Sequence, residues 1–308
     1  MPNRSPPALP YADWRETKDT LHLWAQIVGK VRLASTPPQN HWWNVPLYVD
    51  TRGLTTRRLH SPATDFDIAF DFVDHRLVVR TSRGETESFA LEDGLSVAAF
   101  HASLFALLRG LGIEVAIKAV PFGVPVTRPF AEDAEHHSYD TAFVERYWKA
   151  LSWIDWVFLE FAGWYCGKTS PVHLFWHSLD LAVTRFSGRR APALPEADAV
   201  TQEAYSHEAI SFGFWPGDQT TQQAAFYSYT APEPTGLTGH PLAAGAEWTA
   251  AGSGSLALLP YERVRVAADP RGTLLAFLQS AYEAGTEAAG WPADELRSSW
   301  CPPDVSSR

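Results

Sequence analysis

The sequence predicts an α+β protein made of two similar halves, each a helix, a small antiparallel sheet and a second helix, related by a pseudo-two-fold axis. Three observations lead to this fold class. Helical spacing of apolar residues marks both ends and the middle of the chain, short extended segments with turn residues lie between, and the halves share sequence matches. With 308 residues, the chain can bury one large core or two modest ones.

The first half begins after an irregular, proline-rich arm over residues 1–12. Apolar residues at helical spacing predict a helix over 13–34, which Thr36-Pro37-Pro38 ends because proline has no N–H to donate. The next expected elements are extended segments at 41–51, 66–73, 76–81 and 87–91, a helix at 96–111 and a strand at 114–120. Together they form the first repeat, residues 13–120.

The second half follows a linker at 121–138, which holds three prolines and a charged stretch. This second repeat, residues 139–290, repeats the order of elements and precedes a tail at 291–308. Its expected elements are an aromatic-rich helix at 139–166, extended segments at 172–186, 205–215, 226–230 and 255–259, and a closing helix at 273–289.

Short matches between the halves predict an internal duplication. Ile68-Ala-Phe-Asp-Phe72 matches Ile210-Ser-Phe-Gly-Phe214, Trp24 matches Trp156, His41 matches His173, and Thr51-Arg52 matches Thr184-Arg185. The offset between matching residues only grows along the chain, as insertions at 188–202 and 233–254 would produce. The alternative is that two stretches with the same order of elements align this well by composition. With a duplication, a pocket is expected between the halves.

Composition excludes several classes of function. The formal charge of −10 argues against a nucleic-acid or anionic-membrane surface. No signal-peptide core and no apolar run of ~18 residues occur, and Cys166 and Cys301 form no disulfide framework or zinc motif, so a cytoplasmic protein is expected. Nucleotide-binding glycine motifs and a GxSxG elbow are absent, so nucleotide binding by those routes is not expected. A small-molecule ligand in the pocket between the halves is the expected partner.

Three polar groups that the first half lacks are the candidate catalytic residues: His177, His207 and Glu208. They could act as acid–base groups. Together with His173 they could instead bind a divalent metal such as zinc, iron or manganese. His173 and His177 could share an ion on a helix, but on the expected strand they lie ~13 Å apart. The structural alternative is that each histidine is a half-buried group of an aromatic sheet.

Arginines and tryptophans are the candidate substrate-binding residues. Arg52 and Arg185 end matching segments of the two halves and could hold a carboxylate or phosphate, although a structural role fits their recurrence. Among 13 tryptophans, Trp43, Trp176 and Trp215 lie beside the histidines and could line a pocket, with core packing as the alternative.

Longer motifs identify a family resemblance. Four segments carry it: Leu21-His-Leu-Trp-Ala-Gln-Ile-Val-Gly-Lys-Val-Arg-Leu33, Asn40-His-Trp-Trp-Asn-Val-Pro-Leu-Tyr-Val49, His173-Leu-Phe-Trp-His-Ser-Leu-Asp180 and Ser206-His-Glu-Ala-Ile-Ser-Phe-Gly-Phe-Trp-Pro-Gly-Asp218. With these segments the chain resembles a bacterial family catalogued as a domain of unknown function. The resemblance covers nearly the whole chain and implies a bacterial cytosolic protein. It brings no activity or catalytic residues.

The residues therefore leave three hypotheses for function. The first is an enzyme acting on a small, partly apolar metabolite through the histidine and glutamate cluster. The second is a non-catalytic protein that binds a small molecule in an aromatic pocket. The third is a structural or interaction protein whose aromatic residues form only core and contact surface.

Overall fold

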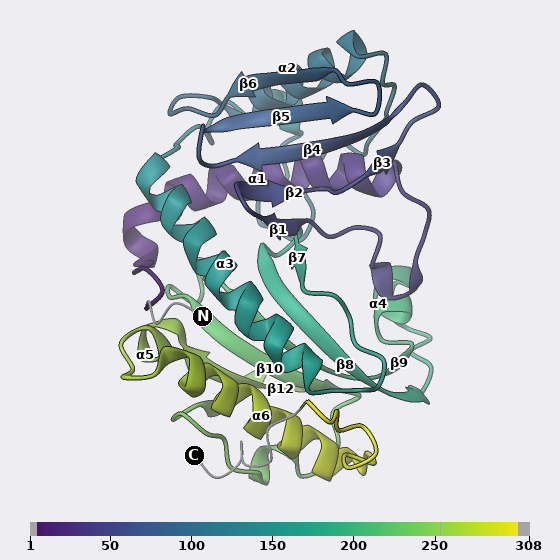
Figure 1. Ribbon diagram of the computed structural model, residues 1–308, viewed down its shortest axis with the longest axis vertical. Coiled ribbons are helices and arrows are strands. Elements are labelled where there is room, and N and C mark those ends of the chain that lie inside the picture. Colours follow the sequence, from purple (N-terminus) through teal and green to yellow (C-terminus); the bar gives the residue numbers. More distant parts are fainter. Residues whose placement is uncertain (1–4, 253, 301–308) are drawn as a thin grey trace.

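Two six-stranded antiparallel sheets form the framework of the protein, and helices flank both of them (Figure 1). The computed structural model describes residues 5–252 and 254–300. Residues 1–4 of the predicted arm and residues 301–308 of the predicted tail, with Cys301, lie outside the described residues. The predicted α+β class, with antiparallel sheets, is confirmed.

The first half holds the shorter strands. Its elements are α1 (Tyr11–Ala34), the 3-10 helix η1 (Asn40–Trp42), β1 (Tyr48–Asp50), β2 (Gly53–Thr55), β3 (Leu59–His60), β4 (Asp65–Asp71), β5 (Arg76–Thr81), β6 (Thr86–Ala90), α2 (Val97–Gly110) and the 3-10 helix η2 (Phe130–Glu132). The strands follow the order β1-β2-β4-β5-β6, with β3 also paired to β4. Ser96 caps α2 by accepting the N–H of Ala99 at 3.1 Å.

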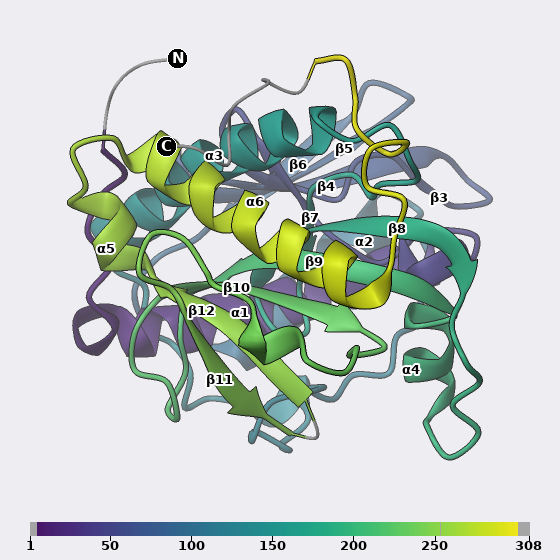
Figure 2. The same cartoon turned by 90° about the horizontal axis from the view of Figure 1, so that it is seen from below.

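The second half holds the longer strands. Its elements are α3 (Thr141–Gly163), β7 (His173–Phe175), β8 (Asp180–Arg190), α4 (Ala199–Ala204), β9 (His207–Trp215), β10 (Ala225–Ala231), the 3-10 helix η3 (Leu237–Gly239), β11 (Glu247–Ala251), β12 (Gly254–Pro260), α5 (Tyr261–Arg265) and α6 (Pro270–Ala289). The strand order is β11-β12-β10-β9-β8-β7. Helix α6 lies across this sheet beside α3, so both helices cover the same face (Figure 2).

One short antiparallel bridge joins the two sheets. The main chains of Leu47 and Leu174 exchange two N–H to carbonyl hydrogen bonds, each 2.9 Å long. Leu47 immediately precedes β1 and Leu174 is the middle residue of β7, so the edges of the two sheets meet here. The indole N–H of Trp176 adds a bond of 3.0 Å to the Val45 carbonyl.

Helix α1 is buried on nearly all of its sides. It runs across the width of the molecule behind the first sheet, and it contacts both α2 and α3 (Figure 1). The polar residues His22 and Gln26 are buried with it, and the His22 ring donates to the carbonyls of Trp176 and His177. Helix α1 therefore packs against both halves of the chain.

Several predicted elements are corrected by the structure. The extended segment predicted at 41–51 is only β1, because His41 and Trp42 have positive φ angles that no strand allows. Residues 114–120 form no strand. The predicted insertions at 188–202 and 233–254 contain α4 and β11, which the sequence analysis did not predict.

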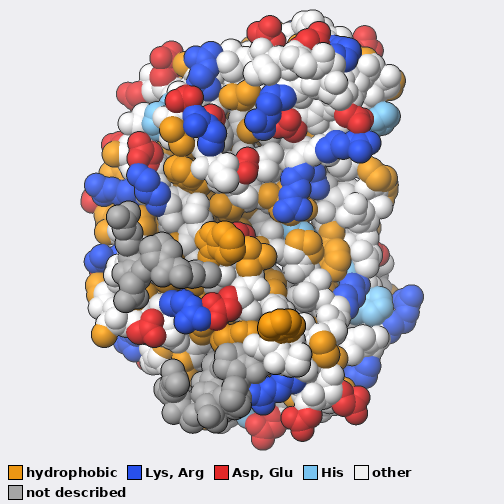
Figure 3. Space-filling model, viewed as in Figure 1, with side chains coloured by type: hydrophobic (Ala, Val, Ile, Leu, Met, Phe, Trp, Pro, Cys, Tyr) orange, Lys and Arg blue, Asp and Glu red, His pale blue; other side chains and the backbone are white. Residues whose placement is uncertain are grey.

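The proposed duplication receives mixed support from the positions of its matching residues. Phe70 and Phe212 occupy comparable places, because each is fully buried in a central strand. In contrast, Trp24 is fully buried, whereas Trp156 on α3 is 61% exposed. Hydrophobic side chains gather on the central part of the face shown in Figure 3. The relation of the two halves by a two-fold axis stays a prediction.

Strand register also separates the Thr-Arg pairs. Phe70 pairs with Leu54, and Phe212 pairs with Val183. When the two central strands are aligned on these phenylalanines, Thr184 is therefore equivalent to Thr55. The sequence matches had made it equivalent to Thr51. Arg52 lies in the turn between β1 and β2, whereas Arg185 lies within β8.

No described helix combines the length and the apolar character that crossing a membrane requires.

Replacing Gly29 with alanine should destabilise the protein by about 1–3 kcal/mol, because a Cβ at this position of α1 would lie 2.1 Å from the Trp176 ring. Helix propensity alone would predict a gain of about 1 kcal/mol for the same change. Gly110→Ala in α2 is the matched control, since a Cβ there meets nothing within 4 Å. Urea unfolding midpoints measure both effects, and equal midpoints for the two variants would contradict the packing of Trp176 on α1.

Candidate functional site

Titratable and aromatic side chains gather where the two sheets meet. We call this group the junction site and define it as His41, Trp43, Tyr48, Arg57, Lys168 and His173. The bridge between Leu47 and Leu174 positions two of them directly, because Tyr48 and His173 are the chain neighbours of the bridged residues. Helix η1, the segment after β2 and the segment after α3 supply the rest.

Lys168 and His41 form the closest contact between functional groups in the junction site. The Lys168 Nζ lies 2.7 Å from the His41 Nε2. The His41 Nδ1 lies 3.2 Å from the Ala204 carbonyl, which can only accept, so Nδ1 carries the ring proton. Nε2 therefore presents its lone pair to Lys168, and the ammonium donates to a neutral imidazole.

His41 is held in a strained backbone conformation. Its φ is +54° and that of Trp42 is +60°, a left-handed region that costs non-glycine residues about 1–3 kcal/mol each. Contacts from α4 compensate: the Glu203 carboxylate accepts the His41 N–H at 3.0 Å, and the Val200 carbonyl accepts the Trp42 indole N–H at 3.0 Å. Helix α4 thus fixes the orientation of His41.

The Lys168 side chain runs over aromatic rings. Its Nζ lies 4.7 Å from the centre of the Phe186 ring and 5.3 Å from that of Trp43. The main chain is anchored as well, because the Phe186 N–H donates to the Lys168 carbonyl at 2.9 Å. Burial lowers the pKa of Lys168, and burial followed by the nearby Lys168 charge lowers the pKa of His41.

His173 lies next to Trp43 and is buried, with 1% of its surface exposed. Its ring centre is 5.9 Å from that of Trp43 and 5.6 Å from that of Tyr48. Neither ring nitrogen has a hydrogen-bond partner among the described residues. Burial, and then the charges of Arg32 and Arg57, lower the pKa of His173 to about 3, so its ring is neutral at neutral pH.

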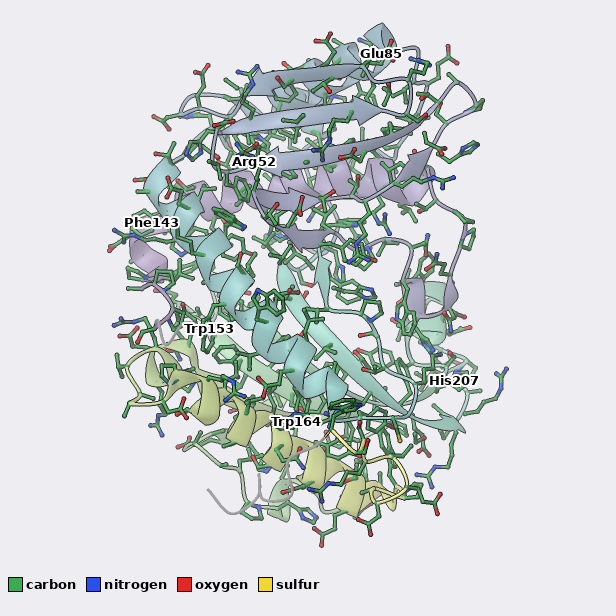
Figure 4. All side chains as sticks on the ribbon, viewed as in Figure 1. Arg52, Glu85, Phe143, Trp153, Trp164 and His207 are labelled. Carbon is green, nitrogen blue, oxygen red and sulfur yellow. The ribbon has the colours of Figure 1, made fainter. Side chains whose placement is uncertain are left out.

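The catalytic set predicted from sequence is not brought together. Leu181 pairs with Phe214 and Arg190 pairs with His207, so His207 lies at the far end of β9 from the β7–β8 turn that holds His177. These ends are roughly 30 Å apart at ~3.3 Å per residue. His207 lies beside His41, with ring centres 5.5 Å apart, near α4 (Figure 4).

Glu208 has a structural role on the opposite face of β9 from His207. Its carboxylate accepts from the Ser187 hydroxyl at 2.9 Å and from the Arg189 guanidinium at 2.8 Å. Arg189 also donates to the carbonyls of Ala289 and Gly290 at the end of α6. The structure therefore does not bring the Glu208 carboxylate together with the His207 ring, because successive residues of a strand point to opposite faces.

The predicted metal-ligand set is not assembled either. Within residues 5–252 and 254–300, no group of three or more His, Cys, Asp or Glu side chains could hold a metal ion. His173, His177, and the pair His207 and Glu208 lie in three different surroundings, which the strand register keeps apart.

His177 lies within electrostatic reach of a separate polar network around Asp180. The hydroxyls of Ser178 and Tyr227 both donate to the Asp180 carboxylate. The Tyr227 ring reaches Asp180 over Gly213, where a Cβ would lie 2.2 Å from that ring. Burial lowers the pKa of His177, and Asp180 opposes this shift.

Neither predicted arginine is available to a ligand in the expected way. Arg52 is exposed and forms ion pairs of 2.6 Å with both Asp71 and Asp74, in the first sheet far from His207 (Figure 4). Arg185 is fully buried, with its guanidinium 3.6 Å from the centre of the Phe161 ring and 4.5 Å from that of Tyr282. The two arginines therefore do not bracket a common site.

The three predicted tryptophans have different positions. Trp43 lines the junction site between Lys168 and His173. Trp176 is buried against α1 and serves packing. Trp215 is the last residue of β9, at the Asp180 end of the second sheet.

No pattern in the sequence marks His41, Lys168 or Arg57 as a site residue. His41 stands out only through its match with His173. The left-handed conformations of His41 and Arg57 are fixed by tertiary contacts, so no local signal marks them.

Acidification should destabilise the protein partly through His173. The neutral ring is favoured in the folded state, where the pKa is about 3, whereas the unfolded chain has the ordinary value of 6.5. The unfolded state therefore binds a proton first, and stability is lost as the pH falls below about 6.5. At pH 5 the loss from one such group is about 2 kcal/mol.

Urea unfolding of the wild type and of His173→Phe at pH 7.5 and pH 5 measures this contribution. The variant should lose less stability than the wild type between the two pH values. His22, whose pKa burial also lowers to about 3, keeps part of the dependence in both proteins. Identical losses would contradict the burial of a neutral His173.

Comparisons with known proteins place the chain in a family. A search of curated proteins and a search of solved structures each returned no match. A family model described as "Family of unknown function (DUF5996)" matches residues 6–298, which is nearly the whole chain. The resemblance found in the sequence motifs is thereby confirmed, and the chain belongs to the DUF5996 family.

Proposed function

We propose that this protein is an enzyme that acts on the carbonyl group of a small, partly apolar molecule, with Lys168 as the nucleophile and His41 as its general base. The observation that carries the proposal is the 2.7 Å hydrogen bond from the Lys168 ammonium to the His41 Nε2. The Ala204 carbonyl holds the opposite ring nitrogen as the N–H, so the lone pair faces the lysine.

The first step is addition of the amine. The Lys168 ammonium gives a proton to the His41 Nε2, which leaves a neutral amine and an imidazolium. The amine lone pair forms a C–N bond with the carbonyl carbon, while the C=O π pair moves to oxygen. That oxygen takes the proton from His41, and the nitrogen then returns a proton to His41, giving a neutral carbinolamine.

The second step is loss of water. The His41 imidazolium protonates the carbinolamine hydroxyl, and the nitrogen lone pair expels it as water. An iminium ion on Lys168, one water molecule and a neutral His41 result. The iminium ion accepts the electron pair released at the α-carbon, the carbon bonded to the iminium carbon. Breaking a C–H or C–C bond of that α-carbon therefore becomes easier.

The surroundings of Lys168 favour a reactive amine. A carboxylate partner stabilises the ammonium form of a lysine, as Glu145 does for Lys149 at 2.6 Å. Lys168 forms no ion pair with a carboxylate in the part of the chain that the structure describes. Its Nζ lies over the rings of Trp43 and Phe186, and burial lowers its pKa while the nearby Glu203 charge opposes that shift.

The strain at His41 supports a functional role rather than packing alone. Six described non-glycine residues have positive φ, and three of them, His41, Trp42 and Arg57, lie in or beside the junction site. Such conformations persist only where the surrounding structure holds them, and they cluster at functional sites. The proposed base is therefore held in one orientation before any substrate arrives.

Reductive trapping tests the proposal. Propanal and sodium cyanoborohydride at pH 7 should alkylate Lys168 about 10-fold or more faster than the ion-paired Lys149, as general-base assistance predicts. Peptide mass mapping measures the rate at each lysine. Lys168→Arg removes the fast site.

His41→Asn tests the role of the base, because asparagine tolerates the left-handed backbone. In this variant Lys168 should react as slowly as Lys149, while the surface variant His60→Asn should react like the wild type. Equal rates at Lys168 and Lys149 in the wild type would overturn the proposal and favour a non-catalytic binding protein.

A further inference from the structure

We propose that Arg57, Arg32 and His173 form an oxyanion subsite around Tyr48, so that the preferred carbonyl substrates carry a carboxylate or a phosphate group. The substrate class rests on the proposed function of Lys168, whereas the oxyanion subsite rests on independent contacts.

Three nitrogen-bearing side chains surround the Tyr48 ring. The Arg57 guanidinium carbon lies 3.4 Å from the ring centre, and that of Arg32 lies 5.3 Å from it. The His173 ring is 5.6 Å away and nearly perpendicular, at 77°. These groups come from α1, from the segment after β2 and from β7, so tertiary structure brings them together.

Buried polar atoms in this group have no partner. Both nitrogens of His173 and the Arg32 Nε are buried without a hydrogen bond among the described residues, and His173 is 1% exposed. Buried polar groups are nearly always hydrogen-bonded, since leaving one unpaired costs about 1–3 kcal/mol. An oxyanion could accept hydrogen bonds from the N–H groups of Arg57. Small movements of the side chains of His173 and Arg32 would then let their nitrogens reach the same oxyanion.

Arg57 differs from its neighbours in having no carboxylate partner. The adjacent Arg58 pairs with Asp65 at 2.8 Å, and Arg80 pairs with Asp67 at 2.6 Å. The Arg57 side chain is exposed and makes no ion pair in residues 5–252 and 254–300, although the chain carries a net charge of −10. Its φ of +55° also places it among the strained residues.

Asp155 is a carboxylate within electrostatic reach of Arg57, and no ion pair joins the two among the described residues. Burial raises the pKa of Asp155 to about 6, while Arg57 opposes the shift. No hydrogen bond to its carboxylate occurs within the described residues, so an incoming oxyanion would displace no existing bond. Removing this charge should therefore strengthen anion binding.

The Trp43 indole lies close to both the subsite and the lysine. Trp43 is 5.9 Å from the His173 ring and 5.3 Å from the Lys168 Nζ. A small molecule with its oxyanion at Arg57 and its carbonyl at Lys168 would lie along Trp43. This arrangement selects carbonyl compounds that carry an anionic group a few bonds away.

Binding of inorganic phosphate and of acetate tests the subsite without any carbonyl chemistry. Isothermal titration at constant ionic strength should show saturable binding of at least one of them to the wild type and to Lys168→Arg. Arg57→Asn should weaken binding at least about 10-fold, as loss of a charged hydrogen-bonding partner predicts, and Asp155→Asn should strengthen it.

Arg58→Asn is the matched control, because it removes the same charge from the neighbouring residue. It should bind like the wild type. Equal weakening by the Arg57 and Arg58 variants, or no saturable binding of either anion, would overturn the subsite and leave Arg57 as a packing residue. Urea unfolding of Arg57→Asn ensures that a loss of binding is not a loss of folding.

Trapping rates then test the substrate class. Succinic semialdehyde and glycolaldehyde phosphate supply the carboxylate and the phosphate, and propanal is the uncharged reference. At least one anionic compound should trap on Lys168 about 10-fold faster than propanal, and Arg57→Asn should remove that advantage, so that anionic and uncharged compounds trap on this variant at similar rates.

The two proposals fail in different ways. Anion binding without fast trapping at Lys168 would leave the subsite standing and overturn the enzyme proposal. Fast propanal trapping at Lys168, without anion binding and without a preference for anionic compounds, would leave the enzyme proposal standing and overturn the subsite.

Discussion

The two main-chain hydrogen bonds between Leu47 and Leu174 are the contact on which the junction site depends. They join the first sheet to the second at β1 and β7, and they place Tyr48 and His173 in adjacent positions. Their register is fixed because Leu47 and Leu174 are both fully buried, and a shift of one residue would expose them. The Trp176 indole, which bonds to Val45 and packs on Gly29, holds α1 to the same joint.

Local patterns predicted most of the regular elements. The helices α1, α2, α3 and α6 and the strands β4, β5, β6, β9, β10 and β12 follow the expected ranges closely, because periodicity and turn residues are local properties. The strand β11 and the helix α4 lie in segments whose glycine, proline and alanine content predicted insertions. Their structure comes from tertiary pairing, which composition does not reveal.

Much less of the site could be predicted. Trp43 and His173, which were both singled out from the sequence, lie next to each other in the junction site. His177 and His207 were grouped because both are absent from the first half, but the register of β8 with β9 sets them at opposite ends. The contact of Lys168 with His41 links residues 127 positions apart in the chain, so no sequence spacing indicates it.

The helix α4 has a consequence for how this site could vary among related chains. It is six residues long, none of them buried, and it lies in the connection between the paired strands β8 and β9. Both sheets and their cores would persist if this segment were shortened, yet the Glu203 and Ala204 contacts that orient His41 would be lost. The segment that orients the His41 imidazole is therefore structurally separate from the two sheets. Related chains can lose or change this segment while they keep the rest of the fold.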